Sequence, residues 1–347
     1  MVLALGIRQD AANKRCDMAQ NPIRPTISLD AQGKHHGFLK LPWSRNDSAW
    51  GALMIPLTVV VNGAGPTALL TGANHGDEYE GPIALQALAH ALQPDQITGR
   101  VIIIPFMNFP AFRAGTRVSP IDSLNMNRAF PGAPDGSVTQ KIANYFNDVL
   151  VPMADLVVDF HSGGKTLDFV PFACAHYLDA AGQQAACVAA VEAFNAPYTL
   201  MLREIDSVGM YDTAVESQGK VLVSTELGGG GTATARSARI ARRGLRNVLI
   251  HAGILAGERE HAPSIMLDMP DDDCFHIAPM AGLIEPLVDL GEVVVLGQPL
   301  AHVWPTDRSG APPVTIVARR DGILVARHFP GLLQMGDCLG VVAVPVG

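Results

Sequence analysis

The sequence lacks several features that would point to particular classes of protein. Its five cysteines lie far apart in 347 residues and form no CxxC pair, so neither a disulfide framework nor a cysteine-type zinc site is indicated. Only 17% of the residues are charged. Apart from the short stretch 236–246, no cluster of Lys and Arg stands out, so nucleic acid is not an expected partner. No apolar run approaches the roughly 18 residues of a membrane-spanning helix.

The composition is typical of a large folded protein. Hydrophobic residues make up 48% of it and the formal net charge is −8. At roughly 100–200 residues per domain, the length predicts two domains. Residues 1–7 are apolar, but no basic region precedes them and no cleavage site follows soon, so we expect no signal peptide and a cytoplasmic protein. Residues 1–24 are expected to be an extension without a clear role.

Residues 25–265 alternate between β-like and helix-like segments. Short strands that are apolar throughout belong in a sheet covered on both faces, which is usually parallel or mixed. The alternation of strands and helices therefore predicts a doubly wound α/β domain. The first predicted strands, which look antiparallel, are 38–41, 53–61 and 67–71. The later predicted strands are 101–105, 156–160 and 221–225. The predicted helices are 81–92, 138–151, 180–194 and 235–252.

Residues 266–347 have a different pattern. Short β-like runs are separated by Gly and Pro, and no segment shows the periodicity of an amphipathic helix. Two halves are weakly alike, because Gly282-Leu-Ile and Gly322-Ile-Leu are each followed by glycines at similar spacings. The pattern predicts a duplicated β unit that forms a compact barrel or sandwich. Chance recurrence of glycine in a Gly-rich tail is the alternative.

Polar residues follow three of the predicted strands. His75 and Glu78 come after strand 67–71, His161 follows 156–160, and Glu226 ends the run at 221–225. In open α/β sheets this edge is where ligands bind. Two imidazoles and one carboxylate that leave a position for water are the ligand set of hydrolytic zinc sites, so His75, Glu78 and His161 are predicted to bind one Zn²⁺. Taken singly, each histidine would more often be structural.

Two acidic residues have predicted roles beside these ligands. Asp159 lies two residues before His161 on the same strand face, where it could orient the imidazole. Glu226 is the candidate general base for an attacking water. It precedes four glycines at 228–231, which are expected to let substrate approach the backbone. A phosphate cradle is the alternative, but the chain has neither GxxxxGK[ST] nor GxGxxG there.

The polar segment 108–132 contains Arg117, Asn127 and Arg128. A guanidinium suits bidentate recognition of a carboxylate, and a second one could stabilise an oxyanion. The residues alone leave equally open that both arginines are solvated loop charges.

Together these motifs resemble the aspartoacylase/succinylglutamate desuccinylase family, relatives of the zinc carboxypeptidases. The resemblance rests on the order and spacing of the HxxE pair, the arginine segment, Asp159-Phe-His161 and Glu226, and it covers most of the chain. It implies a zinc-dependent hydrolase of linear amides, an N-acyl amino acid deacylase. The implied roles are zinc ligation by His75, Glu78 and His161, carbonyl polarisation by Arg117, binding of the substrate α-carboxylate by Asn127 and Arg128, and proton transfer by Glu226.

The resemblance also implies that residues 266–347 form a β barrel-sandwich like biotinyl and lipoyl carriers. The chain has no lysine after Lys220, so this part cannot carry such a cofactor. It is expected to cover the mouth of the active site or to mediate assembly, with a homo-oligomer as one outcome.

Three segments, 41–51, 72–81 and 224–231, are most similar to members that deacetylate N-α-acetyl-L-2,4-diaminobutyrate in ectoine breakdown. The γ-ammonium of such a substrate should face an acid, for which Glu204, Asp206 and Glu216 are candidates. Three alternatives stay open: deacylation of N-acetylaspartate or N-succinylglutamate, a carboxypeptidase-like activity, and a non-catalytic metal-binding protein.

Overall fold

The computed structural model describes residues 20–346. Residues 1–19 of the predicted extension lie outside this part. The rest of the extension packs on the fold, because Ile23 is fully buried and β1 (Arg24–Pro25) pairs with β2 (Gly33–Pro42). None of the helices in residues 20–346 is both long and apolar enough to cross a bilayer.

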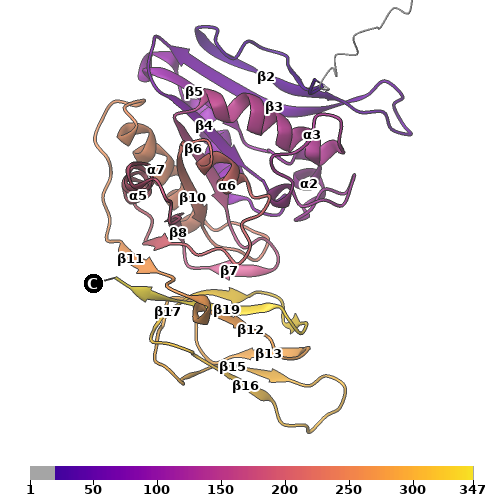
Figure 1. Ribbon diagram of the computed structural model, residues 1–347, viewed down its shortest axis with the longest axis vertical. Helices are drawn as coiled ribbons and strands as arrows, with labels where there is room; N and C mark the ends of the chain where they lie inside the picture. The colour runs from indigo at the N-terminus through magenta and orange to yellow at the C-terminus, as the bar shows by residue number, and fades with distance from the viewer. Residues whose placement is uncertain (1–19, 347) are drawn as a thin grey trace, which may run out of the picture.

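A mixed sheet runs through the centre of the molecule (Figure 1). Its central strands pair in parallel and are almost wholly buried, as the apolar runs predict for a sheet covered on both faces. The strands in spatial order are β1, β2, β3 (Ala52–Asn62), β5 (Gly99–Ile104), β4 (Thr67–Gly72), β6 (Leu156–His161), β10 (Val221–Glu226), β8 (Phe172–Ala175), β9 (Tyr198–Met201) and β11 (Ile265–Asp268), after which the sheet continues into the C-terminal part.

One predicted pairing is wrong. The first strands look antiparallel in sequence, and β2 and β3 are, but β4 does not pair with β3. Instead β5 lies between them, antiparallel to β3 and parallel to β4. All six residues of β4 are buried, so this strand occupies the centre of the sheet, where both of its faces are covered.

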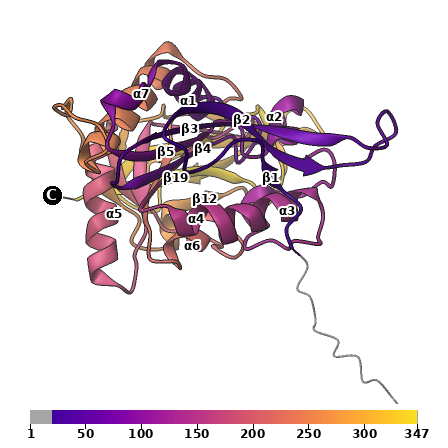
Figure 2. The same ribbon diagram turned by 90° about the horizontal axis from the view of Figure 1, so that it is seen from above.

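Helices cover both faces of the sheet, as a doubly wound domain requires. Figure 2 shows α1 (Glu80–Ala91) and α7 (Ala235–His251) on one side, and α3 (Val138–Tyr145), α4 (Val151–Met153) and α6 (Tyr211–Glu216) on the other. Two apolar clusters correspond to these faces: one contains residues of α1, α5 (Ala181–Phe194) and α7, and the other contains residues of α3 and α6. Ser137 and Thr234 begin α3 and α7 with reciprocal capping hydrogen bonds.

The C-terminal strands repeat one pairing pattern, which agrees with the predicted duplication. β13 (Gly282–Pro286) pairs with β15 (Pro299–Trp304) and with β18 (Leu332–Leu333). β17 (Gly322–His328) pairs with β19 (Cys338–Pro345) and with β14 (Val293–Val294). The short strand of each half, β14 in the first and β18 in the second, therefore pairs with a long strand of the other half. β16 (Val314–Val317) extends β15, and β12 (Phe275–Ile277) pairs with β19.

The two parts of the chain are joined by continuous β structure. The expected boundary between residues 265 and 266 falls at the start of β11, which pairs with β9 on one side and β19 on the other. β7 (Leu167–Phe169) also pairs with β17. The loop that follows β6 is thereby fixed against the C-terminal part.

Candidate active site

A tight turn between β4 and α1 carries His75 and Glu78. The Gly76 amide donates to the Thr116 carbonyl at 3.0 Å, and a Cβ on Gly76 would lie 2.0 Å from the backbone of Ala111, so only glycine fits. His75 Nδ1 lies 2.8 Å from Glu78 Oε1. The turn thus points both side chains at the end of the sheet.

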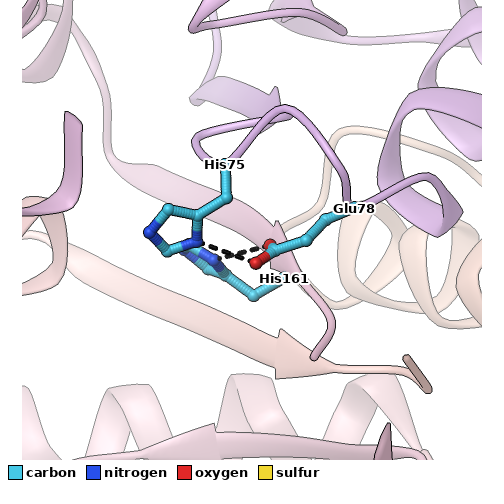
Figure 3. A group of neighbouring side chains, drawn as sticks. All are labelled: His75, Glu78 and His161. Atoms are coloured by element: carbon cyan, nitrogen blue, oxygen red, sulfur yellow. Dashed lines mark hydrogen bonds and ion pairs between the residues drawn. The ribbon is translucent and has the colours of Figure 1, made fainter. Parts of the chain in front are cut away.

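The end of β6 supplies the third member of the group. His161 Nδ1 lies 3.0 Å from Glu78 Oε2, so both imidazoles contact the same carboxylate (Figure 3). One ligand atom from each of the three side chains lies within 4.8 Å of the others, and all three residues are buried. The structure brings together the three residues that the sequence predicts as metal ligands.

The remaining ring nitrogens show which atoms are free to bind a metal. His75 Nε2 lies 3.1 Å from Asn125 Oδ1, and His161 Nε2 lies 2.8 Å from Asp159 Oδ2. Both partners are acceptors, so they place a proton on each Nε2 and leave each Nδ1 with its lone pair directed at the group. The expected contact between Asp159 and His161 is present. Asn125 was not singled out in the sequence, although it lies two residues before Asn127.

Electrostatics within this group favours a bound cation. Burial raises the pKa of Glu78, but the charges of His75 and His161 outweigh burial and lower it well below its ordinary value. Burial lowers the pKa of His75. Burial also lowers the pKa of His161, but Asp159 and Glu78 outweigh it and raise that pKa well above its ordinary value. Positive charge is therefore stabilised between the carboxylates, and a divalent cation could replace the proton.

Glu226 ends β10 directly beside His161, which is its register partner on β6. Its Oε2 is buried and has no hydrogen-bond partner within residues 20–346. Burial, and then the negative charge of Glu78, raise the pKa of Glu226 well above its ordinary value. A raised pKa strengthens the carboxylate as a proton acceptor, which is the property that a general base requires.

The glycines after Glu226 lie close to other parts of the chain. A Cβ on Gly229 would lie 2.0 Å from the Leu167 carbonyl oxygen, and one on Gly230 would lie 2.6 Å from the Phe329 ring. The Gly228 carbonyl accepts from Gly163 at 2.9 Å. Gly229 and Gly230 therefore have no room for a side chain, because the loop packs against Leu167 and Phe329.

Arg117, Asn127 and Arg128 all line the same cavity as His75 and His161. Arg117 is half-exposed and its Nη1 lies 3.6 Å from Glu78 Oε1. The side-chain Oδ1 of Asn127 accepts from the Tyr211 amide at 2.8 Å, which leaves the side-chain NH₂ group as the donor for a ligand. The structure thus favours site residues over solvated loop charges for this segment.

Of the three acids considered for a substrate ammonium, only Glu204 lines this cavity. The sequence reasoning missed Asp212, which also lines it and is almost fully buried. An acid among the apolar residues of a buried helix face is the signal that could have found it, since Asp212 directly follows Tyr211 and precedes Ala214 and Val215 on α6.

The cavity is small, at about 120 Å³. Its lining combines two of the ligand candidates, His75 and His161, with the general-base candidate Glu226, two arginines and two further acids. On an open α/β sheet, a buried set of two imidazoles and a carboxylate beside a carboxyl group of raised pKa is the arrangement of a metal-dependent hydrolase.

Comparisons with known proteins agree with this class. The catalytic-domain model of the succinylglutamate desuccinylase/aspartoacylase family matches residues 64–252. The N-α-acetyl-L-2,4-diaminobutyric acid deacetylase of Halomonas elongata is 54% identical over 325 residues, which cover 93% of this chain and 95% of that protein. The chain belongs to the succinylglutamate desuccinylase/aspartoacylase family.

Solved structures show the same fold. The product-bound structure of the ectoine utilization protein EutE from Ruegeria pomeroyi is 65% identical and covers 94% of this chain and 99% of that chain, with a TM-score of 0.93. A succinylglutamate desuccinylase/aspartoacylase from Rhodobacter sphaeroides is 39% identical and covers 94% and 100% of the two chains, with a TM-score of 0.89. The mixed α/β architecture is therefore that of the family.

Proposed function

We propose that this protein is a zinc-dependent deacetylase that hydrolyses N-α-acetyl-L-2,4-diaminobutyrate to acetate and 2,4-diaminobutyrate. The observation that carries the hydrolase chemistry is the convergence of His75, Glu78 and His161 beside the unpartnered carboxyl oxygen of Glu226. The substrate follows from the 54% identity to the Halomonas elongata deacetylase over most of both chains.

The metal ligands of the proposal are His75 Nδ1, His161 Nδ1 and the Glu78 carboxylate. Two nitrogen donors and one carboxylate suit Zn²⁺ and leave a position open for water or substrate. A bound zinc ion would supply Lewis-acid polarisation of the acyl oxygen and a lower pKa for the attacking water. Asn125 and Asp159 hold the two imidazoles in the tautomer that binds metal.

Glu226 moves the proton in the proposed reaction. Water adds to the acetyl carbon, and the Glu226 carboxylate takes a proton from that water. When the C–N bond breaks, Glu226 returns a proton to the departing amine nitrogen, and acetate is the second product. The raised pKa of Glu226 helps this carboxyl group to hold the proton between the two steps.

The arginine segment binds and orients the substrate. Arg117 lies 3.3 Å from His75 Nδ1, beside the metal-ligand group, where its N–H groups can donate to the oxygen that becomes negative as water adds. Arg128 and the NH₂ group of Asn127 are the donors for the α-carboxylate, because a guanidinium fits a carboxylate in bidentate geometry.

The proposal includes three further properties. Residues 25–265 and 266–347 are proposed as two domains, the second a barrel-sandwich, supported by the repeated pairing around β13 and β17. The compartment is proposed to be the cytoplasm, supported by free thiols at the four cysteines of the described residues. A homo-oligomer is proposed as well, and the molar mass in solution tests it.

The test is a Glu226→Gln variant assayed for acetate release from N-α-acetyl-L-2,4-diaminobutyrate. We expect turnover to fall by about 10²–10⁴-fold while bound zinc is retained. The matched control is Glu192→Gln on the exposed side of α5, which should match the wild type. Retained activity in Glu226→Gln would show that Glu226 is not the base. Comparable wild-type rates on N-acetylaspartate and N-succinylglutamate would contradict the proposed substrate.

A further inference from the structure

The active-site cavity contains two carboxylates that the proposed mechanism does not use, Asp212 and Glu204. Asp212 is only 3% exposed, and its Oδ1 is buried without a hydrogen-bond partner in residues 20–346. Burial raises the pKa of Asp212 to about 6. A buried carboxylate without a partner costs stability, so its presence in a binding cavity points to a cationic ligand.

The neighbours of Asp212 argue against a second metal ion. A carboxylate oxygen of Asp212 lies within 4.8 Å of ligand atoms of Asp159 and His161. However, His161 Nε2–H donates to Asp159, and His161 Nδ1 faces Glu78, so neither ring nitrogen has a lone pair for another metal. A cation that brings its own N–H donors, an ammonium group, needs no such lone pair.

The other candidate acids are engaged or lie elsewhere. Glu216 Oε1 lies 2.8 Å from His176 Nδ1, which makes a close ion pair. Asp206 is exposed and accepts from the Val208 amide at 3.0 Å. Glu204 has a longer contact of 3.8 Å to His176 Nε2, and its side chain remains 25% exposed. Asp212 and then Glu204 are therefore the acids available to a ligand.

We propose that Asp212, assisted by Glu204, forms a subsite for the γ-ammonium group of the substrate, an inference that rests on the proposed function. The cavity then recognises a zwitterion, with Arg128 at the α-carboxylate and Asp212 at the ammonium. Among the described residues that line the cavity, Arg117 and Arg128 are its only Lys or Arg side chains. A second carboxylate on the substrate, as in N-acetylaspartate, would face Asp212 and be repelled.

The experiment compares kcat/KM for N-α-acetyl-L-2,4-diaminobutyrate with that for N-α-acetyl-L-norvaline, in which a methyl group replaces the ammonium. The wild type should prefer the diaminobutyrate. Asp212→Asn should lower kcat/KM for the diaminobutyrate by about 100-fold, because a buried charge loses its partner. Its kcat/KM for the norvaline compound should stay within about threefold, because the apolar side chain makes no charged contact.

Two further variants and a metal assay complete the design. Glu204→Gln, at a partly exposed position, should lower the diaminobutyrate preference by about tenfold. Asp206→Asn is the matched control in the same segment and should keep the wild-type preference. Asp212→Asn should keep the zinc content of the wild type.

The outcomes separate the two proposals. A wild type that releases no acetate from the diaminobutyrate overturns the proposed function and the subsite together. A wild type that turns it over, with the same substrate preference in Asp212→Asn and Glu204→Gln, overturns the subsite alone. An equal loss on both substrates, or a loss of metal in Asp212→Asn, also overturns the subsite, since it assigns Asp212 a structural or ligating role.

Discussion

Two groups of histidine and carboxylate side chains lie in neighbouring cavities of this protein. In the proposed metal-binding group, His75 and His161 direct Nδ1 at the two oxygens of Glu78. In the second group, the single ring of His176 lies 2.8 Å from Glu216 and 3.8 Å from Glu204.

The second group lines the larger cavity, about 890 Å³ against about 120 Å³ for the active-site cavity. Neither cavity size nor a short distance between histidine and carboxylate identifies a metal site. The distinguishing feature is that both rings of the first group have an acceptor at Nε2, which leaves two lone pairs converging on one point. The second group offers a single ring between acids, which is the geometry of an ion pair.

The same substitution in each group should produce the largest difference between them. His161→Gln should reduce acetate release from N-α-acetyl-L-2,4-diaminobutyrate to background, because the metal loses a nitrogen donor. His176→Gln should stay within about threefold of the wild type, because no ligand or base is changed. Steady-state assays with added zinc measure both. An equal loss of activity in the two variants would contradict the proposal that only the first group binds the catalytic metal.

A smaller effect is expected from the residue that orients His161. Asp159 accepts from His161 Nε2, from Thr71 Oγ1 at 2.7 Å and from Asn74 Nδ2 at 3.1 Å. Asp159→Asn would place an NH₂ group against one of these donors, so we expect zinc affinity to fall by about 10–100-fold. Competition with a chromogenic chelator measures it. Asp168→Asn, at a partly exposed ion pair with Arg327, is the matched control and should leave the affinity unchanged.

The smallest effect should come from the His176 ion pair, and it should appear in stability. Burial lowers the pKa of His176, but the nearby carboxylates of Glu204 and Glu216 outweigh burial and hold that pKa well above the ordinary value. The proton therefore binds the folded protein more tightly than the unfolded chain. This stabilisation is fully present below about pH 6.5 and is lost as the pH rises through the folded-state pKa.

Urea unfolding of the wild type and His176→Gln at several pH values tests that expectation. The variant should be less stable by about 2 kcal/mol at pH 6, and the difference should shrink at alkaline pH. A difference that grows with pH would show that His176 is neutral in the folded protein.

The sequence predicted the α/β part of the fold well where segments are long and apolar. The central strands and the helices α1, α5 and α7 are found within one or two residues of the expected limits. The position of β5 between β3 and β4 could not be predicted, because strand order depends on contacts between distant segments. β8 and β9 were missed because each has only four residues, too few to show a period.

The sequence predicted those candidate site residues that directly follow or end a strand. His75, Glu78, His161 and Glu226 mark the ends of three strands, and parallel pairing brings those ends together. Asp212 could not be found in this way, since it lies on the six-residue helix α6. The segment that contains Arg117, Asn127 and Arg128 has little regular secondary structure, so its sequence does not show which way these side chains point. Only the structure shows that they line the cavity.

We propose that the metal binds the group formed by His75, Glu78 and His161 and not the group around His176. The most direct test is the zinc content of purified wild type, His161→Gln and His176→Gln, measured by mass spectrometry of the metal after dialysis. The wild type and His176→Gln should each hold one zinc ion per chain, and His161→Gln should hold none. A full zinc equivalent in His161→Gln, or its loss in His176→Gln, would contradict the account.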